Sequence, residues 1–375
     1  MGNILDYLQW RGDLSFAQSP FNEVDNLILS CFSYVNLDEI TAVQDENGLT
    51  LEALSEEFFK IHTEEELKAD KSFIRHAPFM MRDMAQTRRF GRSVIRNYVN
   101  EIVAEEEQQF SAVEILLEDG STYAAFRGTD DTIVGWKEDF NLSNGIIPAE
   151  ERAAEYLERI GRASSRMLRV GGHSKGGNLA VYAAAKCSEA VRGRIMEIYS
   201  NDGPGFTKRF LEEGSTREIC SRLVRIIPEF SVIGMLLEHE KEPVIVASSQ
   251  KGILQHDGFS WEVLGTSFLR EKGMNKKAAS FNEIFHKWID DMEDSKRVEL
   301  IDELFAVIEA AGVENVSEIQ EGGLKSLQAM FRRFEKSSAD FRIMLQELIG
   351  ALFSGWLERL HAETQDKIPF LSQEK

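Results

Sequence analysis

The sequence predicts an α/β protein in which a mostly parallel β-sheet is covered by helices. Between residues 112 and 247, short apolar runs alternate with longer segments of helical periodicity, a pattern typical of parallel sheets with crossover helices. One of these runs, residues 167–170, leads into two glycines, a serine and an alanine-rich segment. From about residue 278 the chain is charged and has helical periodicity, which predicts a helical C-terminal extension.

The first 90 residues are expected to be mainly helical and to cover one side of the sheet. Residues 21–34 follow Pro20 with apolar side chains at helical spacing, and residues 51–61 repeat that spacing. We expect these helices to bury their apolar faces against the sheet, because an amphipathic helix must cover that face with another element.

The core of the sheet is expected within residues 91–275. It begins with a hairpin, because Asp119-Gly120 is a strong signal for a two-residue turn between strands. The predicted elements are strands at 112–117 and 121–126, a helix at 150–168 that leads into the strand before the serine, and strands at 194–200, 223–227 and 244–247. We therefore divide the chain into a helical cover (1–90), an α/β core (91–275) and a helical C-terminal region (276–375).

Composition and charge exclude several classes of function. The 375 residues carry a net charge of −20, which argues against nucleic acid or an anionic membrane as the main partner. The three cysteines are widely spaced and form no C-x-x-C pair, so we expect a cytoplasmic protein with neither a disulfide framework nor a metal site. Residues 343–357 are the most apolar late stretch, but they include Gln346 and Glu347 and are too short to cross a membrane.

Gly172, Ser174 and Gly176 form a G-x-S-x-G pattern between a predicted strand and a predicted helix. In that context the pattern is typical of a nucleophile elbow, a tight turn that raises one serine hydroxyl above the edge of a sheet. Glycines are needed because side chains at these positions would collide with the neighbouring strand and helix. The turn lacks the spacing of glycine motifs that bind dinucleotides or phosphates, so no cofactor is expected.

A nucleophilic serine needs a histidine base, and in α/β-hydrolases the acid and then the histidine follow the serine along the chain. His256 lies in a loop after the last apolar strand, where a catalytic histidine is expected. His239 lies among three glutamates and is predicted to be solvated, whereas His286 and His361 fall in the helical C-terminal region. His173, beside the serine, is expected to point away from it and to be structural.

The remaining groups of the predicted site come from the ends of strands. Asp202 follows the first strand after the elbow helix and is the first choice for the acid; Glu229 follows the next strand and is the second choice. The negative charge that develops in acyl transfer needs two backbone N–H donors. We expect them from Lys175, directly after the serine, and from Thr129, after the upstream strand.

The motifs FRGT, GGHSKGG and YSNDGPGF together resemble the class 3 (fungal-type) lipases, a branch of the α/β-hydrolases. The opening NILDYLQWRGDLSF, with the rest of the chain, is similar to the bacterial Mbeg1-like family, which also has the domain label DUF2974. The resemblance implies an α/β-hydrolase fold with Ser174 as the nucleophile, His256 as the base, and Thr129 and Lys175 as the oxyanion residues.

Two features depart from the class 3 pattern. Those lipases carry their acid after the second strand beyond the elbow, where this chain has Ser231. Either the acid has moved to Asp202 or the triad is weakened. Residues 130–136, at the place of the lipase lid, are short and acidic, so activation at a lipid surface is not expected.

Two functions remain open on the sequence alone. The first is a lipase- or esterase-like serine hydrolase that cleaves a carboxylic ester or thioester of a small or lipid-like molecule through an acyl-enzyme on Ser174. The second is a weakly active or inactive relative that acts as an interaction module, with the C-terminal helices as the surface for a protein partner.

Overall fold

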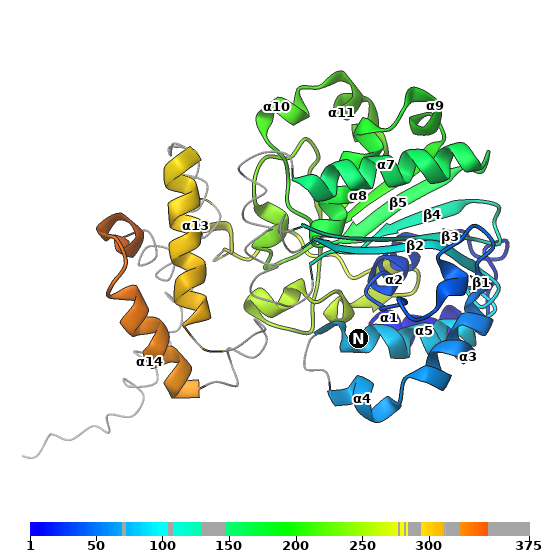
Figure 1. Ribbon diagram of the computed structural model, residues 1–375, viewed down its shortest axis with the longest axis horizontal. Helices are drawn as coiled ribbons and strands as arrows, with labels where there is room; N and C mark the ends of the chain where they lie inside the picture. The colour runs from blue at the N-terminus through cyan, green and yellow to red at the C-terminus, as the bar shows by residue number, and fades with distance from the viewer. Residues whose placement is uncertain are drawn as a thin grey trace, which may run out of the picture.

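The computed structural model describes residues 1–69, 73–103, 108–129, 147–276, 278–280, 283, 294–310, 312 and 323–343. Its centre is a sheet of eight strands, shown edge-on in Figure 1. The strands are β1 (Leu49–Thr50), β2 (Val94–Val103), β3 (Gln108–Leu116), β4 (Thr122–Phe126), β5 (Leu168–His173), β6 (Ile195–Asn201), β7 (Leu223–Pro228) and β8 (Val244–Val246).

The strands lie in the sheet in the order in which they occur in the chain. β1 to β4 pair antiparallel, and β4 to β8 pair parallel. β3 and β4 form the predicted hairpin, whose turn residue Gly120 has a φ of 86°, a conformation that glycine adopts without strain. The predicted α/β fold is therefore confirmed, and the carboxyl ends of the parallel strands meet at one edge of the sheet.

Helices cover both faces of the sheet, as Figure 1 shows. The apolar layer between the sheet and the helices on one face includes Leu157, Leu179 and Val170, and the layer on the other face includes Ile28 and Tyr123. The first face carries α7 (Pro148–Ala163), α8 (Lys175–Lys186), α9 (Glu189–Arg192), α10 (Lys208–Leu211) and α11 (Gly214–Ile219); the second carries α1 (Ile4–Arg11), α2 (Glu23–Phe32), α3 (Leu51–Ile61), α4 (Glu64–Ala69) and α5 (Ala77–Ala85).

A buried ion pair ties the N-terminal helices together. The guanidinium of Arg89 donates from Nε and Nη2 to the two carboxylate oxygens of Asp25, at 2.6 and 2.5 Å, and both side chains are fully buried. Arg89 also donates to the backbone carbonyls of Leu14, Ser19 and Pro20. These bonds compensate the desolvation of the two charges, which a buried pair must overcome.

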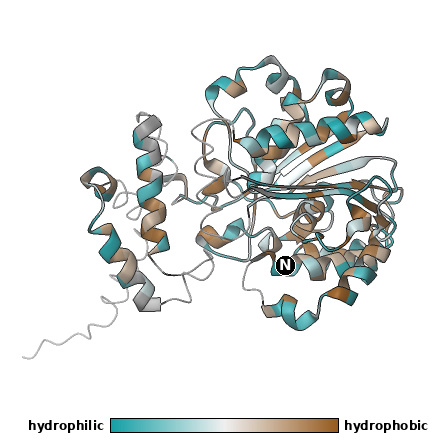
Figure 2. Ribbon diagram, viewed as in Figure 1, coloured by the Kyte–Doolittle hydropathy of each residue, from teal (hydrophilic) through white to brown (hydrophobic). Residues whose placement is uncertain are grey.

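The C-terminal region contains a pair of helices that contact each other, α13 (Asp294–Glu309) and α14 (Gly323–Phe334). Figure 1 shows them beside the layered body rather than on a face of its sheet. Figure 2 shows hydrophobic and hydrophilic residues interspersed along both helices. Phe305 and Phe341 are buried, whereas Phe331 is 60% exposed. A short hairpin, β9 (Val263–Leu264) with β10 (Ser267–Phe268), precedes this region.

Candidate active site

The G-x-S-x-G segment forms a sharp turn between β5 and α8. Ser174 has a φ of 57° and a ψ of −134°, a strained conformation for a residue with a side chain. A Cβ atom on Gly172 would lie 2.3 Å from the backbone of Gly176, and one on Gly176 would lie 2.1 Å from the carbonyl oxygen of Phe126. Both positions therefore require glycine, for the reason that the sequence suggested.

A buried hydrogen-bond network supports this turn from below. The N–H of Ser174 donates to the carbonyl of Asn201 at 2.9 Å. The Asn201 side chain accepts from Asn26 at 2.8 Å and donates to the carbonyl of Gly172 at 3.0 Å, and the Tyr123 hydroxyl donates to Asn26 at 2.7 Å. The network joins α2, β4 and β6, and its side chains are buried. A satisfied buried network of this kind holds the turn in one arrangement.

Three of the residues predicted for the site, Ser174, His256 and Asp202, form a chain of two hydrogen bonds. His256 Nε2 is 3.0 Å from Ser174 Oγ, although 82 residues separate them, and His256 Nδ1 is 2.7 Å from Asp202 Oδ2. A carboxylate can only accept, so Nδ1 carries the hydrogen and Nε2 is left to accept from the serine hydroxyl. His256 ends a short 3-10 turn, Gly252–His256, and Asp202 follows β6. In this arrangement the ring can remove the hydroxyl proton.

The two carboxylates that the sequence suggested for the acid, Asp202 and Glu229, have different partners in the structure. Asp202 is the one hydrogen-bonded to His256. Glu229 accepts a long hydrogen bond of 3.4 Å from the side chain of Gln255, the residue before that histidine. Ser231, the residue at which the sequence departed from the expected class 3 pattern, donates its hydroxyl to Asp202 Oδ1 at 2.5 Å.

The two residues expected to stabilise an oxyanion are both close to the serine along the chain or through a neighbour. Lys175 begins α8 and is buried, with Nζ 3.5 Å from the carbonyl of Gln109. Thr129 is also buried. It follows Gly128, whose Cβ position would be 3.0 Å from the Cβ of Ser174. The backbone before Thr129 therefore packs directly on the elbow.

A second histidine, His173, holds the loop that carries His256. The sequence did not predict this contact. His173 Nε2 donates to the backbone carbonyl of His256 at 2.7 Å, and the Tyr34 hydroxyl donates to His173 Nδ1 at 3.0 Å. Burial, together with the nearby His256 ring, holds the pKa of His173 well below its usual value, so its ring is neutral at pH 7. His173 thus has a structural role, as predicted, but nothing local in the sequence marks Tyr34 as its partner.

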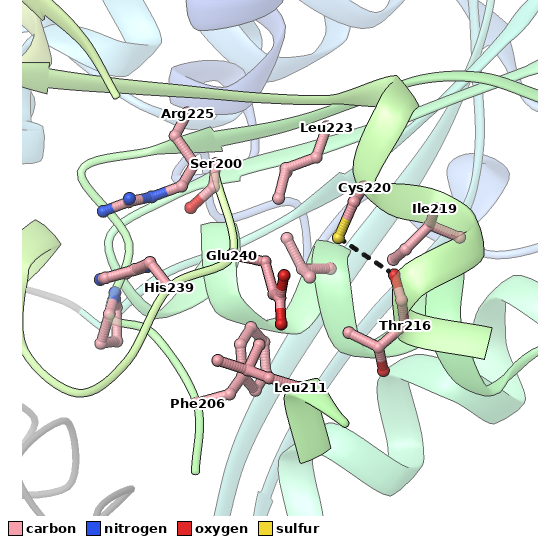
Figure 3. Close-up of a pocket in the computed structure, with 12 residues that line it drawn as sticks. Ser200, Phe206, Leu211, Thr216, Ile219, Cys220, Leu223, Arg225, His239 and Glu240 are labelled. Carbon is pink, nitrogen blue, oxygen red and sulfur yellow. Dashed lines mark hydrogen bonds between the residues drawn. The ribbon is translucent and has the colours of Figure 1, made fainter. Parts of the chain in front are cut away.

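Several predicted features lie elsewhere or outside the described residues. His239 is half-buried rather than solvated, and it lines a small cavity of about 20 Å³ with Arg225 and Phe206 (Figure 3). That volume holds about one water molecule. His286, His361 and residues 130–136 are outside the described part of the chain.

A larger cavity of about 340 Å³ lies between α3, α4 and the residues after α2. Its lining mixes apolar and charged side chains, and it includes Tyr34, the partner of His173. Among the residues that the structure describes, no three His, Cys, Asp or Glu side chains are grouped to hold a metal ion. Within that same part of the chain, no helix combines the length and the apolar character needed to span a membrane.

Two lipases are among the solved structures that this chain is similar to, both at low identity. The native propeptide complex of Rhizomucor miehei lipase is 15% identical with a TM-score of 0.39, over 63% of this chain and 79% of that chain. M37 lipase is 16% identical with a TM-score of 0.34, over 56% and 68% of the two chains.

No curated protein sequence matches this chain. The model of one protein family, described as Mbeg1-like, matches residues 84–306, more than half of the sequence. The chain therefore belongs to the Mbeg1-like family.

Proposed function

We propose that this protein is a serine hydrolase that cleaves a carboxylic ester or thioester through an acyl-enzyme on Ser174. One observation carries the proposal: Ser174 Oγ, the His256 ring and the Asp202 carboxylate form an unbroken row of hydrogen bonds of 3.0 and 2.7 Å. Nucleophile, base and orienting acid in that geometry are the recurring arrangement of serine hydrolases on unrelated folds.

In the proposed reaction, His256 Nε2 takes the proton of the Ser174 hydroxyl as Oγ attacks the carbonyl carbon of the substrate. The backbone N–H groups of Thr129 and Lys175 stabilise the oxyanion of the tetrahedral intermediate. The intermediate collapses as His256 passes its proton to the leaving alcohol or thiol, which leaves an ester on Oγ. Water, deprotonated by the same ring, then attacks that ester and releases the acid and the free serine. Asp202 stabilises the imidazolium that forms in both halves.

The N-terminal cover (1–90) contributes to this proposed site. Asn26 supports the elbow through Asn201, and Tyr34 supports the His256 loop through His173. We therefore propose that the reaction needs the cover as well as the α/β core. The substrate class that we propose is a small-molecule or lipid-like ester.

The test is hydrolysis of p-nitrophenyl acetate and of an acyl thioester by the full chain. Ser174→Ala should lower kcat on the order of a millionfold, as loss of the nucleophile does in well-studied triads. Ser249→Ala, a serine whose hydroxyl donates to the carbonyl of Ser260, is the control and should keep full activity. Equal rates for wild type and Ser174→Ala would contradict the proposal.

A second candidate function has an observation of its own. Phe331 on α14 is 60% exposed, and Ile343 beyond it is 50% exposed, so the C-terminal helices present apolar side chains to solvent. An interaction module that uses these helices would bind a protein partner without turning over an ester. A folded protein with an unreactive Ser174 would favour this second function over the first.

A further inference from the structure

The two carboxylate oxygens of Asp202 have separate partners. Oδ2 lies 2.7 Å from His256 Nδ1, and Oδ1 accepts the hydroxyl hydrogen of Ser231 at 2.5 Å. Asp202 is completely buried, and its φ of 50° lies in the left-handed region, which few residues with side chains adopt. Its N–H is held by the carbonyl of Ile226 on the neighbouring strand. The backbone bond to Ile226 and the Ser231 bond to Oδ1 thus hold the Asp202 carboxylate in place, and Oδ2 remains directed at His256.

The loop after β7 closes over Oδ1. A Cβ atom on Gly234 would lie 2.2 Å from Asp202 Oδ1 and 2.8 Å from Ser231 Oγ. Only a glycine can come this close to both oxygens. The Ser231 hydroxyl is itself buried, so its hydrogen bond to the carboxylate is shielded from water and is strong for that reason.

A buried cation lies behind the same loop. Arg225 on β7 donates from Nη2 to the carbonyl of Gly234 at 2.8 Å, and from Nη1 to that of Lys241. Figure 3 shows its side chain at the edge of the small cavity. Burial lowers the pKa of Arg225 to about 10, against the attraction of Asp202. The guanidinium is therefore still charged at pH 7, and its bond to Gly234 holds the loop that carries Ser231 in place.

We propose that Ser231 is a positioning residue of the hydrolase, one that acts on His256 through Asp202. Its hydroxyl fixes Oδ1, so that Oδ2 keeps the imidazole ring in the orientation and tautomer that the serine needs. This inference rests on the proposed function and extends it: the acid of the site is a pair, a carboxylate from the end of β6 and a hydroxyl from the loop after β7.

The experiment compares Ser231→Ala with Ser231→Thr, which keeps a hydroxyl. The control is Ser121→Ala. Ser121 is also buried and also donates to an aspartate Oδ1, that of Asp119, at 2.5 Å, but it lies at the β3–β4 turn. For each variant we would measure kcat and KM on p-nitrophenyl acetate, the rate at which a fluorophosphonate labels Ser174, and the melting temperature.

Ser231→Ala should lower kcat by roughly 10- to 100-fold, the effect of losing one hydrogen bond to a charged group, with little change in KM. Ser231→Thr should recover most of that loss, and Ser121→Ala should leave kcat and labelling unchanged. In the Asp202→Asn background, Ser231→Ala should slow labelling by less than about threefold, because a residue that acts through Asp202 loses its effect with the carboxylate.

Two results would overturn the inference while the proposed function stands. One is a reactive wild-type Ser174 with an unchanged kcat in folded Ser231→Ala. The other is a loss of the same size whether Asp202 is present or replaced in the Asp202→Asn background, which would show that Ser231 acts by another route. An unreactive Ser174 in the wild type would overturn both the inference and the proposed function.

Discussion

Replacing Gly176 by alanine should disable the proposed site more than it destabilises the fold. The added Cβ atom would lie 2.1 Å from the carbonyl oxygen of Phe126 and 2.9 Å from the nitrogen of Gly128. Since Cβ atoms essentially never come closer than 3.0 Å to such atoms, the end of β4 must move away from the elbow by roughly 1 Å. That movement would carry the N–H of Thr129, one of the two proposed oxyanion donors, away from the position proposed for the oxyanion.

The expected loss follows from this displacement. A misplacement of about 1 Å costs on the order of 10²-fold in rate, and loss of one oxyanion donor costs roughly 10²- to 10³-fold. Overpacking itself should lower the free energy of unfolding by about 1–3 kcal/mol. We therefore expect Gly176→Ala to fold and to hydrolyse p-nitrophenyl acetate with kcat/KM reduced by roughly 10²- to 10³-fold.

The assay is steady-state hydrolysis together with urea unfolding of the same samples. Gly214→Ala is the matched control, because a Cβ atom there meets no atom within 4 Å. It should leave the rate unchanged and should not lower the free energy of unfolding, because alanine fits this helical position without strain. A folded Gly176→Ala protein with kcat/KM near that of the wild type would refute the reasoning, since the collision at Phe126 would then have no consequence at the serine.

Three further predictions concern the base, the buried ion pair and a buried acid. His256→Ala should lower kcat on the order of a millionfold, and adding Ser174→Ala should cost little more, because the two side chains act as a unit; separate, multiplying losses in the double variant would contradict this. Arg89→Met leaves Asp25 buried without its cation and should lower the free energy of unfolding by about 3–5 kcal/mol. Arg82→Met, which breaks an exposed pair with Glu64, should lower it by about 1 kcal/mol or less. Equal losses for the two variants in urea denaturation would contradict this prediction. Burial raises the pKa of Glu150 from 4.5 to about 8. Between pH 4.5 and about 8, the native chain therefore holds a proton that the unfolded chain has released. The free energy of unfolding should then fall by up to about 1.4 kcal/mol for each unit of rising pH. Glu150→Gln should flatten that decline in unfolding measurements from pH 5 to 9, and parallel profiles for the two proteins would be inconsistent with it.

The features that the sequence predicted well are those determined by neighbouring residues. The hairpin at Asp119-Gly120 and the turn around Ser174 depend on backbone conformations that only a few residue types permit, and those residues are visible in the sequence. The helix at 51–61 coincides with α3, because its apolar spacing is regular. The strand that feeds the serine was expected at the end of a helix over 150–168, and the structure ends that helix at Ala163.

β2 escaped prediction because its pattern is interrupted. Asn97 has a φ of 51°, and the pairing with β3 shifts register between Arg96 and Val99. A bulge of this kind moves the following side chains to the opposite face, so the alternation that identifies a strand is lost. β1 is only two residues long, too short to give any pattern at all.

The sequence also did not predict the polar contacts between residues far apart in the chain. The partners of Asn26 and Asp25 are Asn201 and Arg89, which are 175 and 64 residues away, and no local signal connects them. The position of Ser231 suggested a displaced acid or a weakened triad, and only the folded geometry brings its hydroxyl to Asp202. Chain order and strand ends could nominate the chemical groups, but the distances between them follow from packing.

The most direct measurement of the central claim is labelling of the folded wild-type protein with a fluorophosphonate, followed by peptide mass spectrometry. We predict a single adduct on Ser174 that forms only in the folded chain and whose formation slows at least a hundredfold in His256→Ala. No adduct on Ser174 in folded wild-type protein, or labelling at the same rate without the His256 ring, would contradict it.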